Sequence, residues 1–223
     1  MPGRFVSIEG IDASGKSTLV AGLVRRLRDR GIDAVSIVKK QDEGYGHPFV
    51  DRLAHHLKAM LWDATPEDPV GMVAEYPWTL MHALWYELQQ EHLLGPLLRQ
   101  HDVVVTDGWY YKFFARHMVH APEQADRTKV VLGTVREADV VLFLDVTPEE
   151  CWSRRPAFRP SEVGAHAQVD GASEREKFLT YQGQVYDQFR ALASRGAAWR
   201  IIEAIGRTPD EIAGAMAEEV VRP

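Results

Sequence analysis

The stretch Phe5-Val-Ser-Ile-Glu-Gly-Ile-Asp-Ala-Ser-Gly-Lys-Ser-Thr18 decides the fold of this 223-residue chain. Within it, residues 10–17 fit the pattern G-x-x-x-x-G-K-[ST] at every fixed position. Apolar residues before the pattern predict a buried strand, and leucines and valines at helical spacing after it predict a helix that ends near Gly31. A strand, this glycine loop and a helix in direct succession indicate a phosphate-binding loop rather than a glycine turn that binds nothing.

The residue types of this loop suit a triphosphate. Gly10 and Gly15 have no Cβ, so the backbone can curl and direct its N–H groups at an anion. The following helix adds a partial positive charge at its first turn. Lys16 can reach the β- and γ-phosphates, and the Ser17 hydroxyl can bind Mg²⁺. We therefore expect ATP and Mg²⁺ as cofactors, with the ATP phosphates bound by Gly10, Asp12, Ala13, Ser14, Gly15, Lys16, Ser17 and Thr18.

Composition and charge limit the class of protein. An apolar fraction of 45% and a charged fraction of 26% are ordinary globular values, and the length suits one α/β domain spanning residues 1–223. The net charge of −6 argues against nucleic acid or an anionic membrane as a partner. The single cysteine, Cys151, allows no intrachain disulfide, the opening residues lack a signal-peptide pattern, and Val140–Leu144 is too short to cross a bilayer. We expect a cytoplasmic protein without membrane contact.

Continuous apolar strands alternate with helical patterns along the rest of the chain. Strands are predicted at residues 33–38, 102–107, 138–145 and 199–203. Helices are predicted at residues 49–62, 65–99 with a break near Pro77, 109–120, 122–136, 147–155, 173–195 and 209–221. Thr65–Asp68 is predicted to cap the second of these, and Thr147–Glu150 and Thr208–Glu211 are predicted capping boxes. This alternation predicts an α/β fold, a P-loop three-layer sandwich with helices on both faces of a parallel sheet.

Asp107 closes the apolar strand at residues 102–107, at the edge where parallel sheets bind ligands. In phosphate-loop enzymes an acid at this edge commonly orients Mg²⁺ or its water shell, so Ser17 and Asp107 are the candidate metal-binding residues. The alternative is that Asp107 caps the helix predicted at residues 109–120.

A segment at about residues 155–172 contains prolines and a glycine but no long apolar run. We predict that it forms a flap (a LID segment) that closes over the nucleotide and excludes water. Arginines can neutralise the charge that develops during phosphoryl transfer. The candidate catalytic residues are therefore Lys16, Arg154, Arg155 and Arg159, with Arg175 further along the chain. The alternative is a solvated loop whose arginines pair with Glu162 and Glu174.

Cations and aromatic residues near the same edge suggest a site for the acceptor. Lys39 follows the second strand, and Lys112 and Arg116 share one face of the helix after Asp107. These cations could hold an acceptor phosphate, or they could be surface residues without a partner. Aromatic rings could form the wall of a base pocket or part of the core. They are Tyr76, Trp78, His82, Trp85, Tyr86, Trp109, Tyr110 and Tyr111.

Taken together, these motifs resemble those of the thymidylate kinase family of nucleoside-monophosphate kinases. The similarity covers F-V-S-I-E-G-I-D-A-S-G-K-S-T at 5–18, G-P-L-L-R-Q-H-D-V-V-V-T-D at 95–107, D-V-V-L-F-L-D-V-T-P-E at 139–149 and the arginine-flanked segment thereafter. The resemblance implies a five-stranded parallel sheet, a flap over ATP, a homodimer, and transfer of the ATP γ-phosphoryl group to a nucleoside monophosphate. It assigns Asp12 to the sugar and phosphate region of the acceptor. Because Ala13 stands where one branch of the family has a catalytic arginine, it places the catalytic arginine in the flap.

Three departures from the family pattern fall in the acceptor site. Asp107-Gly108 replaces Asp-Arg after the third strand, and Lys39-Lys40-Gln41 replaces Arg-Glu-Pro after the second. Counting back from Pro96, the arginine that reads thymine falls on Tyr86 and the preceding acid on Trp85. Lysine does not reproduce the fork of arginine, so we expect a rebuilt pocket whose acceptor need not be dTMP. The candidate acceptor-binding residues are Asp12, Lys39, His82, Tyr86, Trp109, Lys112 and Arg116.

The sequence therefore predicts a kinase that moves a phosphoryl group from Mg·ATP to a mononucleotide, dTMP or a related nucleotide. A second hypothesis is a kinase for a nucleoside or another hydroxyl. That chemistry needs a carboxylate base, for which Glu9, Asp12 and Asp107 are candidates. A third hypothesis is a nucleotide-binding switch that no longer phosphorylates anything.

Overall fold

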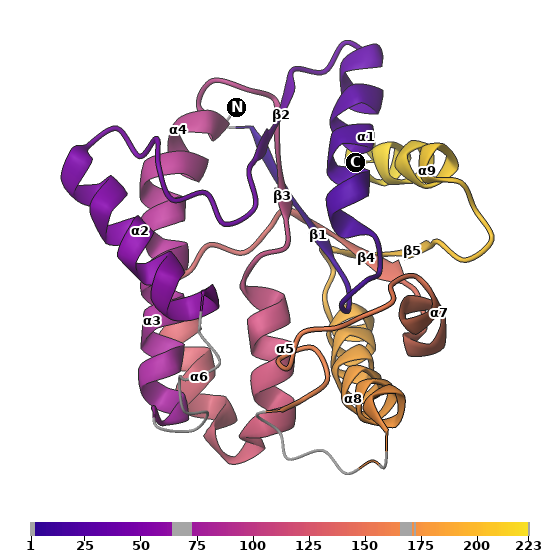
Figure 1. Cartoon of the computed structure of the whole chain (residues 1–223). Helices are drawn as coiled ribbons and strands as arrows, with labels where there is room; N and C mark the ends of the chain where they lie inside the picture. Colours follow the sequence, from indigo (N-terminus) through magenta and orange to yellow (C-terminus); the bar gives the residue numbers. More distant parts are fainter. Residues whose placement is uncertain (1–2, 64–72, 166–170, 172, 223) are drawn as a thin grey trace.

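A five-stranded parallel sheet forms the centre of the computed structural model, which describes residues 3–63, 73–165, 171 and 173–222 (Figure 1). The strand order is β2-β3-β1-β4-β5. The strands are β1 (Arg4–Glu9), β2 (Ala34–Ile37), β3 (Val103–Asp107), β4 (Val140–Asp145) and β5 (Trp199–Glu203). β1 lies between β3 and β4, with Ile8 opposite Asp107 and Glu9 opposite Phe143. The predicted parallel sheet is confirmed.

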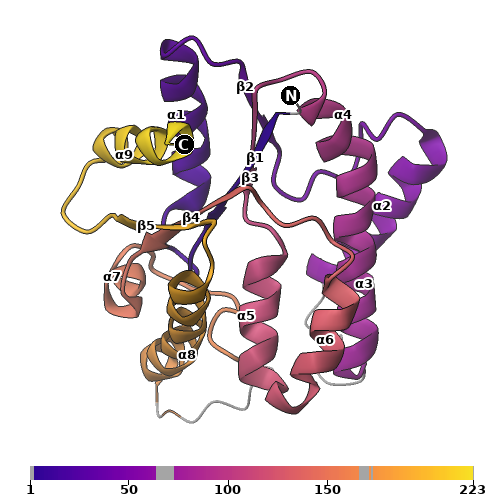
Figure 2. The ribbon, with the colours of Figure 1, turned by 180° about the vertical axis from the view of Figure 1, so that it is seen from behind.

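Helices cover both faces of this sheet, as predicted. α1 (Lys16–Asp29) and α9 (Pro209–Val221) pack together on one face, and α4 (Gly95–Leu98) and α8 (Glu174–Arg195) pack on the other (Figures 1 and 2). α5 (Tyr110–His120) lies between α3 (Glu75–Gln89) and α8. The remaining elements are α2 (Pro48–Trp62), the π-helical turn η1 (Gln90–Leu94), the 3₁₀ turn η2 (Pro122–Gln124), α6 (Ala125–Leu132) and α7 (Pro148–Ser153). Of the described helices, none has the length and apolar character needed to span a bilayer.

The three inner strands are apolar on both sides because both faces of the sheet are covered. In β1, Phe5, Val6 and Ile8 are fully buried, and β3 and β4 repeat this with runs of buried valine, leucine and phenylalanine. In α1 the buried leucines recur at helical spacing and face the sheet. The chain passes from β1 to β2 and β3 on one side and then to β4 and β5 on the other. Ligands bind at such a switch point, beyond the carboxyl end of β1.

Several predicted helix boundaries were wrong. Pro77 does not interrupt a helix, because it lies in the first turn of α3, where a missing N–H group leaves no helical bond unmade. The helical region that follows continues through η1 into α4. The helix predicted at residues 122–136 is a 3₁₀ turn followed by α6, which ends at Leu132. The predicted cap at Thr65–Asp68 lies outside the described residues.

Helix capping follows the predictions at one site and differs at another. Thr208 and Glu211 form a complete capping box at the start of α9. Thr147 caps α7 by accepting a hydrogen bond from the Glu150 backbone N–H group. Here the box is incomplete, because the carboxylate of Glu150 pairs with Arg154 four residues further on.

Candidate nucleotide-binding site

The turn from β1 into α1 uses backbone conformations that favour glycine. Gly10 has a φ angle of 153° and Gly15 one of 101°, and Ala13 between them has 62°. A Cβ atom on Gly10 would lie 2.7 Å from Ser14 Oγ, so a larger residue there would displace the loop. α1 begins at Lys16, which directs the positive end of the helix at this turn. The predicted loop geometry, with glycine where a side chain does not fit, is present.

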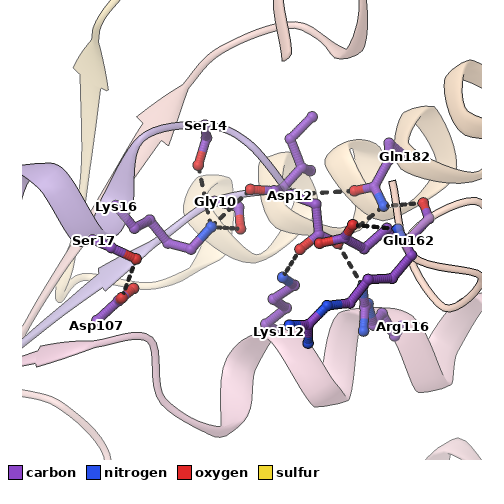
Figure 3. Close-up of polar contacts among 12 residues, drawn as sticks. Gly10, Asp12, Ser14, Lys16, Ser17, Asp107, Lys112, Arg116, Glu162 and Gln182 are labelled. Carbon is purple, nitrogen blue, oxygen red and sulfur yellow. Dashed lines mark hydrogen bonds and ion pairs between the residues drawn. The ribbon is translucent and has the colours of Figure 1, made fainter. Parts of the chain in front are cut away.

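Lys16 is buried and holds the loop closed. Its Nζ atom donates hydrogen bonds to the carbonyl oxygens of Gly10 (2.8 Å) and Ile11 (2.7 Å) and to Ser14 Oγ at 3.2 Å (Figure 3). Burial lowers the pKa of Lys16, and the negative charge of Asp12 opposes this shift. A phosphate group placed in the loop would exchange these neutral acceptors for a charged one.

Ser17 and Asp107 meet at the carboxyl ends of β1 and β3. Ser17 Oγ donates a hydrogen bond to Asp107 Oδ2 at 2.5 Å, and Lys39 Nζ lies 3.2 Å from the same oxygen. Asp107 Oδ1 is buried and has no hydrogen-bond partner among the described residues. The described part of the chain holds no cluster of three or more His, Cys, Asp or Glu residues suited to a metal. One carboxylate and one hydroxyl fit Mg²⁺, which takes few protein ligands and completes its shell with phosphate and water oxygens.

Asp12 is a loop carboxylate held by cations from α5. Lys112 donates to its Oδ1 atom and Arg116 to its Oδ2 atom, and Gln182 on α8 donates to Oδ2 from Nε2 at 3.1 Å (Figure 3). Burial alone would raise the pKa of Asp12, but the charges of Lys112 and Arg116 outweigh it and hold the pKa well below its usual range. The two predicted α5 cations therefore meet a predicted loop residue, and neither is a surface cation without a partner.

Glu9 ends β1 directly before the loop and is fully buried. Its Oε1 atom accepts hydrogen bonds from Ser7 Oγ (2.7 Å) and from the backbone N–H of Trp109 (2.6 Å). Its Oε2 atom is buried without a hydrogen-bond partner in the described residues. Burial raises the pKa of Glu9 to about 7, although the two hydrogen bonds favour the ionised form.

Residues 154–165, which we call the arginine segment, run alongside the loop. Arg154 Nη1 donates to the carbonyl oxygen of Ser14 at 2.9 Å, so Arg154 reaches the loop directly. Arg155 instead pairs with Glu162 at 2.9 Å, as the solvated-loop alternative predicted, and Glu162 also accepts from the Arg159 backbone N–H. The charge of Arg159 also reaches Lys40. Burial of Lys40 and this nearby charge lower the pKa of Lys40 to about 8.

The structure describes the predicted flap only in part, and Arg175 follows it in the sequence. Residues 166–170 and 172 lie outside the described residues. Arg175 is exposed in the first turn of α8.

Most of the predicted aromatic wall belongs to the core. Trp109 is 2% exposed, and its Nε1 atom donates to the carbonyl oxygen of Arg136 at 2.9 Å. Tyr86 is buried against Trp109 and donates from its hydroxyl to the Trp109 carbonyl oxygen. Trp85 is also 2% exposed. For these three residues the structure agrees with the core alternative, because their rings pack against neighbouring side chains.

His82 is less buried than these aromatic residues but is still covered by neighbours. It stacks on Phe113 with ring centroids 3.9 Å apart, and its Nδ1 atom lies 2.9 Å from the Trp78 carbonyl oxygen. Burial lowers its pKa to about 4, so the ring is neutral at physiological pH.

One contacting residue, Gln182, was missed by sequence reasoning. Gln182 occupies the apolar face of α8 together with Phe178, Val185 and Phe189, all of which are buried. A polar residue on an apolar helix face is a signal that could have identified it, because buried polar groups need partners. Glu162 was expected only as a partner of the flap arginines, and its backbone contact with Gln182 was not foreseen.

The chain is similar to known thymidylate kinases over most of its length. No family model matches it. It is 28% identical over 200 residues to the thymidylate kinase of Chromohalobacter salexigens, covering 86% of this chain and 87% of that protein. It is also 28% identical over 222 residues to that of Rhizorhabdus wittichii, covering 98% and 97%. A solved structure of thymidylate kinase from Candida albicans matches in fold with a TM-score of 0.65 at 20% identity, covering 98% of this chain and 91% of that one.

The parallel sheet with its glycine loop, Lys16 and the Ser17–Asp107 pair defines a phosphate-loop α/β protein. Within that class, the chain is distantly similar to thymidylate kinases over nearly its full length.

Glu9→Gln tests the buried carboxyl group through the pH dependence of stability. The pKa is raised in the folded protein, so the stabilisation is complete below the unfolded value of 4.5 and is lost as the pH rises through about 7. From pH 5 to pH 8 the wild type should lose on the order of 2 kcal/mol of unfolding free energy relative to Glu9→Gln. Urea unfolding at both pH values measures this, with the exposed Glu203→Gln as control. A difference between wild type and Glu9→Gln that stays constant with pH contradicts the prediction.

Proposed function

We propose that the protein catalyses ATP- and Mg²⁺-dependent phosphoryl transfer to a nucleoside monophosphate. Its relatives are thymidylate kinases, which are nucleoside-monophosphate kinases and generally use ATP and Mg²⁺. The observation that carries the proposal is the convergence of Lys16, the Ser17–Asp107 pair and Arg154 on one loop at the carboxyl edge of the sheet. Phosphoryl transfer needs this combination of anion cradle, metal oxygens and mobile positive charge.

Each group has a separate task in the proposed reaction. The loop and Lys16 hold the transferring phosphates, and Arg154, with Arg155 and Arg159 from the same segment, neutralises charge in the transition state. Ser17 and Asp107 hold Mg²⁺, which when bound neutralises charge on the phosphate oxygens. These tasks are positioning and electrostatic stabilisation, so an ionised acceptor phosphate requires no general base.

The acceptor phosphate is assigned to the cations beside the loop. Lys39 contacts Asp107 and Lys112 contacts Asp12. Both lysines lie near Lys16: the charge of Lys39 lowers the pKa of Lys16, and the charge of Lys16 lowers the pKa of Lys112. Arg116 completes the group through its own contact with Asp12. These cations stand in for the arginines of the family pattern, and the acceptor need not be dTMP.

One observation favours a second candidate, a kinase that phosphorylates a hydroxyl group. Such an enzyme needs a carboxylate base, and Glu9 has a pKa of about 7 and a buried Oε2 atom without a described partner. Asp12 and Asp107 suit this role less well, because cations hold both carboxylates.

A single domain spanning residues 1–223, a homodimer and a cytoplasmic location remain proposals based on the family. Support for the homodimer comes from α3, where Leu80 and Leu84 are 45% and 42% exposed one helical turn apart. Exposed apolar residues at this spacing form a stripe that a second copy could cover.

Lys16→Met should lower kcat by about 100-fold or more, because the side chain keeps its apolar length but loses the charge that stabilises the transferring group. Initial rates at saturating ATP measure the effect. Lys129→Met, on the exposed surface of α6, should leave the rate unchanged. A Lys16→Met protein with normal kcat would exclude Lys16 from the reaction.

Asp107→Asn should raise the Mg²⁺ concentration for half-maximal turnover by about tenfold or more, since the amide preserves shape but removes a charged ligand. The matched control is Asp145→Asn, at the carboxyl end of β4, where the carboxylate binds Tyr186 and Arg190. Equal Mg²⁺ dependence in wild type and Asp107→Asn would remove the metal assignment.

Lys112→Gln should raise the acceptor KM by about tenfold, with the KM for ATP nearly unchanged, because one charge-assisted bond is lost.

An acceptor panel of mononucleotides, nucleosides and small alcohols, with ATP and Mg²⁺, should yield nucleoside diphosphates without a strong preference for dTMP. Clear preference for dTMP defeats the rebuilt pocket. Products from hydroxyl acceptors support the second candidate, and ATP binding without any product supports the nucleotide-binding switch.

A further inference from the structure

Gln182 lies in the middle of α8, fully buried on its apolar face. Its amide makes three hydrogen bonds (Figure 3). Oε1 accepts from the Asp12 backbone N–H at 3.2 Å, and Nε2 donates to Asp12 Oδ2 at 3.1 Å and to the Glu162 carbonyl oxygen at 2.7 Å. Both N–H groups and the carbonyl of one side chain are therefore used.

These bonds join two segments that are far apart in sequence. At one end Asp12 belongs to the phosphate loop. At the other end Glu162 belongs to the arginine segment, where its carboxylate binds the Arg155 side chain and the Arg159 backbone N–H. Apart from Gln182, the direct hydrogen bond described between this segment and the loop is the one from Arg154 to the Ser14 carbonyl.

The donor pattern at Gln182 is specific to an amide. Nε2 faces two acceptors, the Asp12 carboxylate and the Glu162 carbonyl, whereas Oε1 faces the Asp12 N–H donor. A glutamate would place acceptor against acceptor and a second negative charge beside Asp12. An apolar side chain of the same length would leave buried polar groups without partners.

The support for this bridge is rigid. α8 is a 22-residue helix whose buried face packs on the sheet and on α5 and α7. A side chain on a packed helix holds its partners more accurately than one on a loop. The arginine segment contains turns and no regular helix beyond α7, so its position depends on contacts such as this one.

We propose that Gln182 is a positioning residue that fixes the arginine segment against the phosphate loop, so that its arginines lie over the transferring phosphoryl group. Gln182 acts through Asp12 and Glu162 and does not touch the reacting atoms. The assignment rests on the proposed function for its catalytic consequence, whereas the bridge itself can be measured without turnover.

The first experiment measures the bridge by hydrogen–deuterium exchange of the full-length protein without nucleotide. In Gln182→Met, amides of residues 155–165 should exchange about tenfold faster, because the segment has lost its link to the phosphate loop. Gln184→Met, an exposed position two residues along the same helix, should exchange like the wild type. Unchanged exchange in residues 155–165 of Gln182→Met overturns the proposal.

The second experiment measures the consequence for catalysis. Gln182→Met should lower kcat by about 10- to 100-fold with the KM for ATP nearly unchanged, since the loop and Lys16 remain while the arginines are misplaced. In a double-mutant cycle with Arg155→Met, the two losses should not multiply, because both act through the same segment. If the kcat losses of the two single variants multiply in the double variant, Gln182 has a role unrelated to the arginines, and the proposal is overturned.

Two further results keep the outcomes separate. If Gln182→Met does not fold, Gln182→Asn keeps the amide but shortens it by one methylene, and should show the same changes in exchange and kcat with smaller size. If the wild type binds ATP but transfers no phosphoryl group to any acceptor, the proposed function fails, and with it the catalytic role of Gln182. Faster exchange of residues 155–165 in Gln182→Met then still supports the bridge.

Discussion

Asp12 is a buried carboxylate between two cations, and the arrangement of the whole site depends on this contact. Lys112 and Arg116 come from α5, Gln182 comes from α8, and Asp12 itself belongs to the loop after β1. A buried charge is costly unless it is paired and hydrogen-bonded. The loop, α5 and α8 therefore have one relative position in which all these groups are satisfied.

The other charged side chains of the site also contact groups of the protein itself. Lys16 donates to carbonyl oxygens of its own loop, and Asp107 Oδ2 contacts Ser17 and Lys39, whereas Asp107 Oδ1 has no hydrogen-bond partner among the described residues. Binding a nucleotide would exchange these partners rather than fill an empty site. The net effect of binding is then a difference between two sets of charged hydrogen bonds, each strong in a buried setting. Phosphate oxygens suit this exchange because they offer more charge than backbone carbonyls.

The two halves of the proposed site follow the sequence pattern of thymidylate kinases to different degrees. The loop keeps every fixed residue of its pattern, and the structure gives it the glycine conformations that pattern requires. On the proposed acceptor side, Tyr86 and Trp85 stand where the resemblance leads us to expect polar residues, and both are buried, Tyr86 against Trp109 and Trp85 against Trp62. Under the proposed function, these rings occupy the place of polar groups that would read a thymine, and recognition of the acceptor is assigned to Lys39, Lys112 and Arg116.

The sequence by itself determined that a buried strand, a glycine turn and a helix follow one another at the start of a parallel α/β sheet. The spacing of apolar residues and the two glycines are local properties that can be read without the fold. The sequence also placed Lys16, Ser17 and Asp107 at one edge, because parallel strands share their carboxyl ends. Only the tertiary structure decided which charges meet. Three contacts show this: Asp12 pairs with Lys112 and Arg116, Gln182 bonds to Asp12, and the buried Trp109 bonds to Arg136. The residues in these contacts are about 30 to 170 positions apart in the sequence. Such pairings depend on how helices pack over the sheet, which residue type and spacing do not specify.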